Sequence, residues 1–186
     1  GGADVVIAMV HCGEEYQRTP NRRKKQTVEA FAKAGADVIL GSHPHILQNL
    51  EWHTVSQNGI EKNVLVAYSM GNFISSQIQR DSILKDIGAI LKFRIKKSQE
   101  GITIDQLSVM PTYSYWNSRE IGVVPLIKAY HDLKSYPCLT QRGRRDIKRS
   151  KQQTIDVLTS TLKKQYEIDT VSGFINFSQE PQHLAP

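Results

Sequence analysis

The pattern of apolar and polar positions over the first 40 residues predicts a strand, a helix and a second strand. Residues 4–10 (DVVIAMV) form a continuous apolar run rich in β-branched side chains, which is typical of a strand buried on both faces. Residues 37–40 repeat this pattern after a helical stretch. Strands connected through one helix in this way are expected to be parallel and adjacent in a sheet.

The stretch between these two strands has the start and stop signals of a helix. Thr19 and Pro20 have the residue types of an N-cap and a first helical position, and Gly35 is typical of a helix end. We expect the apolar face to carry Val28, Phe31 and Ala32, and the opposite face to carry the basic run at 22–25.

The following residues change to the alternation that is typical of antiparallel strands. Residues 46–55 and 63–69 predict two strands joined by a turn around Asn58-Gly59, which is a hairpin signal. Further strands are expected at 86–97 and 102–110, linked through SQEG, and at 121–128. The expected fold class is α/β: a βαβ unit followed by an antiparallel β section and a C-terminal helix.

The C-terminal part is predicted to hold one long helix and a tail. Residues 141–166 carry an apolar face formed by Ile147, Ile155, Leu158 and Leu162. Residues 142–164 hold eight Lys/Arg and two Asp, whereas the rest of the chain has sixteen residues of each charge. The basic character is therefore local: it is the solvated face of this helix or a surface for a polyanion. The last twenty residues are expected to be loosely held.

Composition places the chain among ordinary globular proteins. With 186 residues, 39% hydrophobic and 23% charged, it is long enough for one domain with an appendage and too apolar for wholesale disorder. No apolar run approaches the roughly 20 residues that span a bilayer. The two cysteines leave a single disulfide possible. The start GGADVVIAMV has no initiator Met and no basic region, so we expect a piece of a longer protein whose export signal or membrane anchor lies upstream.

Both strands of the βαβ unit end in loops that carry histidines, namely His11 after the first and His43 and His45 after the second. The carboxyl ends of neighbouring parallel strands share one edge of a sheet, so the three imidazoles should lie close together. The loop 68–73 (YSMGNF) is expected to approach the same edge. Imidazoles bind Zn, Mn, Fe or Ni, so this pattern indicates a metal site. The alternative is that they are ordinary loop histidines, as we expect of His53, His131 and His183.

Other side chains near these loops leave more than one interpretation open. Glu14 and Glu15 supply carboxylates, although we expect at least one of them only to cap or solvate the loop. Cys12 is either a thiolate ligand or, as we prefer, a small residue buried beside the sheet. The sequence has no G-x-S-x-G elbow and no phosphate-binding P-loop, which disfavours a serine hydrolase and a nucleotide-loop protein.

Three motifs in this order and spacing resemble a known family. HCGEEY is followed by a proline and Gln26, then by GADVILGSHPHILQ and YSMGNFI. Together they resemble the bacterial CapA family of poly-γ-glutamate capsule-synthesis proteins, whose fold is similar to that of calcineurin-like metallophosphoesterases. The resemblance covers residues 1–130, as the C-terminal part of such a domain. Residues 131–186 lie outside it, as a basic helical extension and tail.

The resemblance implies a partial α/β/β/α sandwich with a centre for two divalent metal ions of the Mn/Fe/Zn class. The family's metal-binding and catalytic histidines fall on His11, His43 and His45. Its substrate-binding positions fall on Glu14, Tyr16, Asn72 and Phe73. Two residues depart from the family's usual motifs, Cys12 in place of a tryptophan and Ser42 before the first histidine of the pair.

The resemblance also implies that the site is completed outside this chain. The family's early motifs supply further ligands, so we expect the upstream half of the same protein, or a partner, to carry them. The implied function is a metal-dependent hydrolase-like site acting on cell-envelope polymer, in a membrane-anchored or extracytoplasmic protein. The alternative is a non-catalytic accessory protein whose basic helix binds an anionic polymer such as poly-γ-glutamate during export. A nucleic-acid partner is not expected, because no aromatic side chains interleave with the basic residues.

Overall fold

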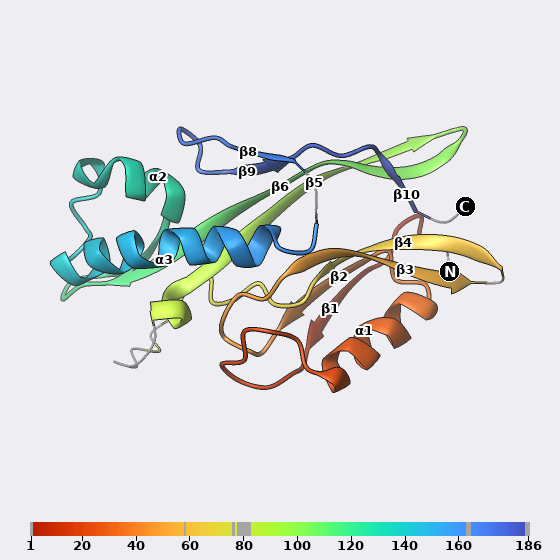
Figure 1. Cartoon of the computed structure of the whole chain (residues 1–186), viewed down its shortest axis with the longest axis horizontal. Helices are drawn as coiled ribbons and strands as arrows, with labels where there is room; N and C mark the ends of the chain where they lie inside the picture. Colours follow the sequence, from red (N-terminus) through yellow and green to blue (C-terminus); the bar gives the residue numbers. More distant parts are fainter. Residues whose placement is uncertain (1, 58, 76, 78–82, 163–164, 185–186) are drawn as a thin grey trace.

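The fold has two β-sheets packed against each other, with helices on the outside (Figure 1). This computed structural model describes residues 2–57, 59–75, 77, 83–162 and 165–184. A single apolar core between the sheets contains side chains of both, including Leu65 of the first sheet and Ile104 and Val109 of the second. The mixed α/β class predicted from the sequence is confirmed.

The first sheet has the strand order β1-β2-β4-β3. Its strands are β1 (Ile7–His11), β2 (Val38–Ser42), β3 (Leu50–Gln57) and β4 (Ile60–Ala67). β1, β2 and β4 are parallel, and β3 pairs with β4 in the antiparallel sense. The predicted βαβ unit and hairpin are therefore confirmed. Within the hairpin turn, Gly59 has a φ of 80°, whereas Asn58 lies outside the described residues.

The prediction that the first strand is buried on both faces was wrong. β1 is an edge strand whose partner is β2, and Ala8 and Val10 pack toward the helix-covered face. The side chains on the other face of β1 are exposed to solvent; Met9, for example, is 85% exposed. A continuous apolar run therefore did not distinguish an edge strand from a central one.

Helix α1 (Arg22–Lys33) covers the outer face of the first sheet through Val28 and Ala32. It begins two residues later than the predicted start at Thr19 and Pro20. The Asn21 side chain caps it by accepting a hydrogen bond from the backbone N–H of Lys24 at 2.8 Å. Phe31 is 42% exposed rather than part of the buried face.

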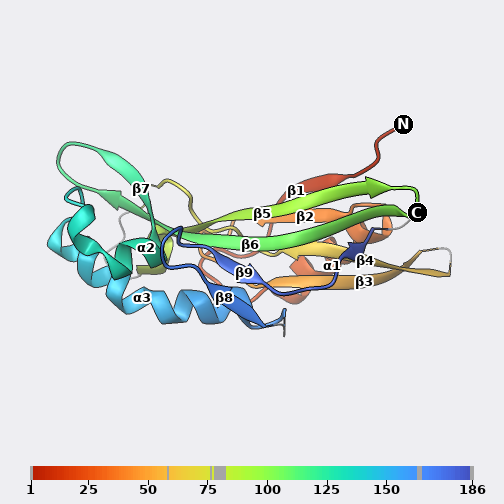
Figure 2. The same cartoon turned by 90° about the horizontal axis from the view of Figure 1, so that it is seen from above.

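The second sheet is organised around one long strand. β6 (Gly101–Trp116) pairs with four others: β5 (Ile87–Ser98), β7 (Ile121–Pro125), β9 (Ile175–Phe177) and β10 (Gln182–His183). β8 (Tyr166–Ile168) extends the sheet beyond β9. Figure 2 shows β5 and β6 running the length of the molecule. The strands predicted at 86–97 and 102–110 are confirmed, whereas the stretch predicted at 121–128 ends as a strand at Pro125 and continues as helix α2 (Leu126–His131).

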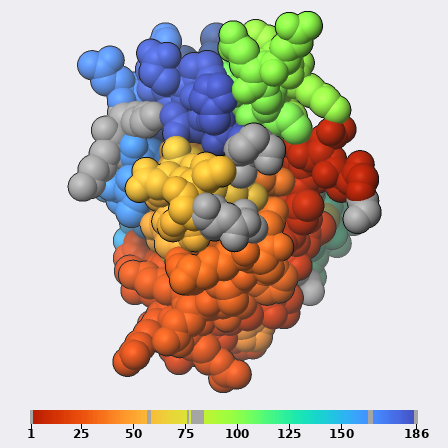
Figure 3. All heavy atoms as spheres, turned by 90° about the vertical axis from the view of Figure 1, so that its right-hand side faces the viewer, coloured from red at the N-terminus to blue at the C-terminus, as the bar shows by residue number. Residues whose placement is uncertain are grey.

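The expected loose tail is instead part of the fold. β8, β9 and β10 are strands of the second sheet, and Ile175, Phe177 and Leu184 are buried in the core. Gln182 also accepts a hydrogen bond from the Asn63 amide of β4 at 3.2 Å. Figure 3 shows this C-terminal segment seated between the β5–β6 hairpin and the β3–β4 hairpin. Strands only two or three residues long are too short to show a periodic pattern of apolar residues.

Helix α3 (Gln141–Thr159) is shorter than the predicted 141–166 and packs on β6 and α2. Its Ile147, Ile155 and Leu158 enter the core, and Leu162 is buried just beyond the helix. In the described part of the chain, no helix has the length and apolar content needed to cross a membrane. The two cysteines are both free thiols.

Asp86, just before β5, provides a test of the electrostatics at the base of α3. Burial and the nearby Asp146 raise its pKa to about 6 although Arg142 lowers it. The folded chain therefore keeps this proton to higher pH than the unfolded chain does, and stability is lost as pH rises from about 4 to 6. We expect Asp86→Asn to raise the unfolding free energy at pH 7.5 by about 1 kcal/mol, because the side chain is only partly buried, and to have no such effect below pH 4.

The measurement is urea denaturation at both pH values, with Asp156→Asn on the exposed side of α3 as control. The control should change stability by less than about 0.5 kcal/mol at either pH. A stabilisation by Asp86→Asn that is equal at pH 7.5 and pH 4 would contradict a proton-linked origin.

Candidate functional site

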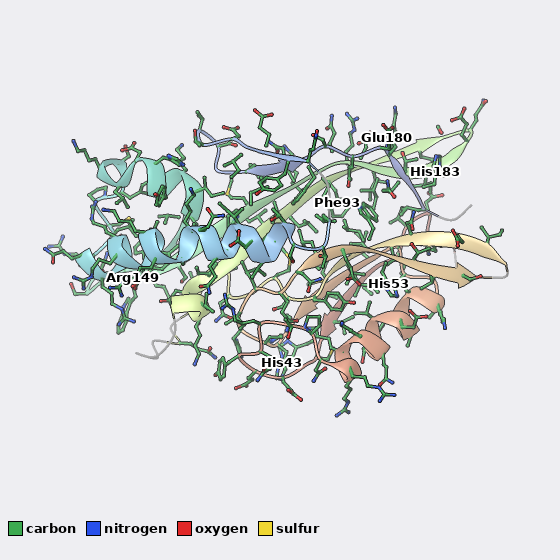
Figure 4. All side chains as sticks on the ribbon, in the orientation of Figure 1. His43, His53, Phe93, Arg149, Glu180 and His183 are labelled. Atoms are coloured by element: carbon green, nitrogen blue, oxygen red, sulfur yellow. The ribbon has the colours of Figure 1, made fainter. Side chains whose placement is uncertain are left out.

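The three predicted loops meet at the carboxyl edge of the first sheet. The β1–β2 ladder ends where His11 pairs with Ser42, and the loops after both strands continue from that point. The loop after β4 is joined to them because the Met70 N–H donates to the Gly41 carbonyl at 3.0 Å. Figure 4 shows His43 in these loops and His53 and His183 elsewhere on the molecule. The structure therefore brings together the three loops that the sequence placed at one edge.

His11 and His43 are in direct contact. His43 Nδ1 lies 3.1 Å from His11 Nε2, and the ring centroids are 4.8 Å apart in an edge-on arrangement. The other nitrogen of His11, Nδ1, lies 2.9 Å from the Ser42 hydroxyl. A Ser42–His11–His43 chain of hydrogen bonds thus fixes both rings, and its direction depends on which nitrogens carry protons.

His45 is held separately, by Asn72 of the third loop. The Asn72 side-chain N–H donates to the Lys85 carbonyl at 2.9 Å, which leaves its oxygen facing His45 Nδ1 at 3.0 Å. Because an amide oxygen only accepts, His45 Nδ1 carries the proton and donates. Nε2 of the neutral ring is therefore a free acceptor, and it lies 4.0 Å from a Glu15 carboxylate oxygen.

The backbone of this site is held in a conformation that side-chain-bearing residues rarely adopt. His43, His45 and Tyr16 have φ angles of 91°, 61° and 63°. The loops fix one another, because the Tyr16 N–H donates to the carbonyl of Pro44 at 2.8 Å. Such strained residues cluster at functional sites, where the surrounding structure holds them. The strain supports a functional role for these histidines over the alternative of ordinary loop residues.

The candidate substrate-binding residues lie on both sides of the imidazoles. Tyr16 stacks on His45 at a centroid distance of 6.0 Å, and the Lys85 ammonium lies 3.6 Å above the Tyr16 ring. Desolvation and the neighbouring Glu15 carboxylate raise the pKa of Tyr16. Glu14 lies on the His11 and His43 side, and Phe73 follows Asn72 in the third loop with 51% exposure.

A cavity of about 360 Å³ opens beside the His11–His43 pair. It lies between the strand-end loops and the first turns of α1. Its lining combines imidazole, carboxylate, guanidinium and ammonium groups: His11, Cys12, Gly13, Glu14, Asn21, Arg23, Lys24, Thr27 and His43. Cys12 thus lines the cavity instead of being sealed beside the sheet.

Lys24 is a site residue that lies on the buried face of α1, so its predicted place on the solvent-facing side of the helix was wrong. It is only 2% exposed, and its ammonium donates to the carbonyls of Cys12 at 2.9 Å and Ser42 at 3.3 Å. Burial lowers its pKa to about 8. The signal was present in the spacing, because residues 24, 28 and 32 recur every four positions on one helix face.

The donor set fits part of a metal centre. Two nitrogen ligands about 2.0–2.1 Å from one tetrahedral ion lie about 3.3 Å apart, close to the 3.1 Å between His11 Nε2 and His43 Nδ1. Both nitrogens would then be unprotonated, so His11 Nδ1–H would donate to Ser42. Within the described ranges, no group of three or more His, Cys, Asp or Glu side chains is arranged to hold an ion. The residues therefore supply a pair of ligands rather than a closed site.

Comparison with known proteins shows what the N-terminal part of the chain is similar to. Residues 1–77 match the family described as "Bacterial capsule synthesis protein PGA_cap". The chain is similar to the PGA biosynthesis protein CapA of Bacillus subtilis (strain 168), with 35% identity over 102 residues, 53% of this chain and 23% of that protein. It is also similar to the capsule biosynthesis protein CapA of Bacillus anthracis, with 39% identity over 77 residues, 41% of this chain and 17% of that protein. The matched segments thus span less than a quarter of either relative.

The orientation of Asn72 generates a prediction about His45. Asn72→Ala removes the acceptor at Nδ1, so we expect neutral His45 to move its proton to Nε2, which faces the Glu15 carboxylate at 4.0 Å. The measurement is long-range ¹H–¹⁵N NMR of the ring nitrogens at pH 8. Phe73→Ala, the adjacent loop residue, is the control and should leave the proton on Nδ1. A ring that keeps its proton on Nδ1 in Asn72→Ala would show that Asn72 does not set the tautomer.

Proposed function

We propose that residues 1–77 belong to the bacterial capsule synthesis family PGA_cap and that the chain forms part of a capsule biosynthesis protein with a metal-dependent, hydrolase-like site. The relatives are named for capsule and PGA biosynthesis, which supports poly-γ-glutamate or a similar anionic cell-envelope polymer as the substrate class. The cell envelope is accordingly the proposed location, with membrane association through a segment outside this chain.

The observation that carries the metal proposal is the contact between His11 Nε2 and His43 Nδ1 at 3.1 Å. These two nitrogens would hold a divalent ion of the Mn/Fe/Zn class, while Nε2 of His45 is the third available nitrogen, on the Glu15 side. When bound, such ions lower the pKa of a coordinated water and polarise a scissile bond. Residues outside this chain would supply the further ligands, including those that hold the second ion of a two-metal centre.

The chain's own polar groups prepare this site. With an ion bound, Ser42 would accept the Nδ1 proton of His11 and leave the Nε2 lone pair free for the ion. Asn72 accepts the Nδ1 proton of His45 and leaves the Nε2 lone pair of that ring free. Arg23 and Lys24 place positive charge on the cavity wall, which suits a carboxylate- or phosphate-bearing polymer. Tyr16, which stacks on His45, and the exposed Phe73 offer aromatic surface.

Zinc binding by this chain tests the metal proposal. We expect His11→Ala and His43→Ala each to weaken Zn²⁺ affinity at least 10-fold, because each removes one of two paired ligands. Competition with a chromophoric chelator measures this affinity. The control is His183→Ala, an exposed histidine on β10, which should bind as the unmodified chain does. Affinity that is equal in all four proteins would contradict the assignment.

A second surface supports contact with an anionic polymer. On α3, Arg144 is used by the fold, because its guanidinium donates to the carbonyls of Leu133, Tyr136 and Leu139. Arg142 lies 3.4 Å from the Asp146 carboxylate. Arg145, Lys148 and Arg149 are exposed, and Figure 4 shows Arg149 far from His43. Only some of the basic side chains of α3 are therefore available to bind a polymer, and these lie apart from the histidine site.

This surface predicts a salt-dependent interaction. We expect Arg149→Glu to weaken binding of poly-γ-glutamate several-fold at low salt, and the difference to shrink as salt screens the charges. Fluorescence anisotropy of a labelled polymer at several salt concentrations is the measurement. Lys96→Glu makes the same charge change on exposed β5 and should have a smaller effect. An equal loss in both variants would indicate general charge attraction without a site on α3.

A further inference from the structure

We propose that Lys24 is a positioning residue whose ammonium ties the loop after His11 to the strand end before His43 and so sets the separation of the two imidazoles. The purpose of that separation rests on the metal site proposed above. The two hydrogen bonds that Lys24 makes are observed in the structure and do not depend on that proposal.

Helix α1 delivers this side chain to the site. The Asn21 cap fixes the backbone of Lys24 by accepting its N–H, and side chains in the first turn of a helix point back toward its N-terminus. There the Lys24 side chain lies under Gly13. A Cβ at position 13 would lie 3.2 Å from Lys24 Cδ. The φ angle of Gly13, 121°, also disfavours any residue with a side chain at this position. Gly13 therefore lets the loop after β1 close over the lysine.

The two acceptors of Lys24 are the carbonyls next to the histidines in sequence. Cys12 directly follows His11, and Ser42 directly precedes His43. The β1–β2 ladder ends at His11 and Ser42, so beyond this point backbone pairing no longer holds the two chain segments together. The ammonium supplies that link at the place where the two rings must face each other.

The energetic cost of burying this lysine indicates that its two hydrogen bonds have a role. Among the described residues, no carboxylate lies within ion-pair distance of Lys24, although the side chain is buried. A buried cation that is balanced only by carbonyl groups costs stability relative to an apolar side chain of similar length. Methionine would fill the same space but could not join the two carbonyls. The two hydrogen bonds are what distinguishes lysine here.

The test compares Lys24→Met with Lys25→Met, an exposed neighbour on the same helix with the same charge change. The first measurement is ¹⁵N NMR of the His11 and His43 rings without metal, and the second is Zn²⁺ affinity. We expect Lys24→Met to shift both ring resonances and to weaken Zn²⁺ binding about 10- to 100-fold, as loss of a ligand-orienting partner does. Lys25→Met should change neither. The backbone amide spectrum of β3 and β4 verifies that each variant is folded.

A third variant decides the result if Lys24→Met does not fold. Lys24→Gln keeps an NH₂ donor group, but this group lies one bond closer to the backbone than the lysine ammonium. We expect it to reach at most one of the two carbonyls and to give intermediate shifts and an intermediate loss of affinity. Ring resonances that are unchanged in a folded Lys24→Met or Lys24→Gln variant would overturn the proposal. If the unmodified chain binds no Zn²⁺, the metal proposal fails, while the ring resonances still decide whether Lys24 positions the histidines.

Discussion

The parallel pairing of β1, β2 and β4 is the constraint on which the candidate site depends. Because these strands run in one direction, the segments that follow them must emerge at the same edge of the sheet. Gly41 allows the closest approach, since a Cβ at this position would lie 2.0 Å from the Tyr68 carbonyl oxygen. The loop after β4 therefore lies against the end of β2 and brings Asn72 to His45.

Polar partners hold this arrangement from three directions. Ser42 contacts His11, Asn72 contacts His45, and Lys24 joins the chain on either side of the His11–His43 pair. The positive φ angles of His43 and His45 are strained conformations that such partners can maintain. Rings fixed in tautomer and orientation before a ligand arrives lose less freedom on binding, which is the usual advantage of a preorganised site.

Much of this architecture could be predicted from the sequence, because the relevant signals are periodic or topological. Apolar runs and turn residues gave the βαβ unit and the hairpin, and the parallel-edge rule then gave the meeting of His11, His43 and His45. The errors have specific causes. The apolar run of β1 did not show that Met9 lies on an open edge, and β9 and β10 are too short to have a period.

Lys24 shows a different limit of sequence reasoning. Its four-residue spacing from Val28 places it on the buried helix face, but lysine is almost never buried without a charged partner. The residue type therefore favoured the wrong interpretation. Only the carbonyls of Cys12 and Ser42, which come from two other elements, account for its position.

The most direct test of the central claim is a crystal structure of the chain grown with Zn²⁺, with anomalous diffraction data collected at the zinc edge. We expect an anomalous peak about 2.0–2.1 Å from both His11 Nε2 and His43 Nδ1. Two rings still in hydrogen-bond contact, with no peak between them at saturating zinc, would contradict it.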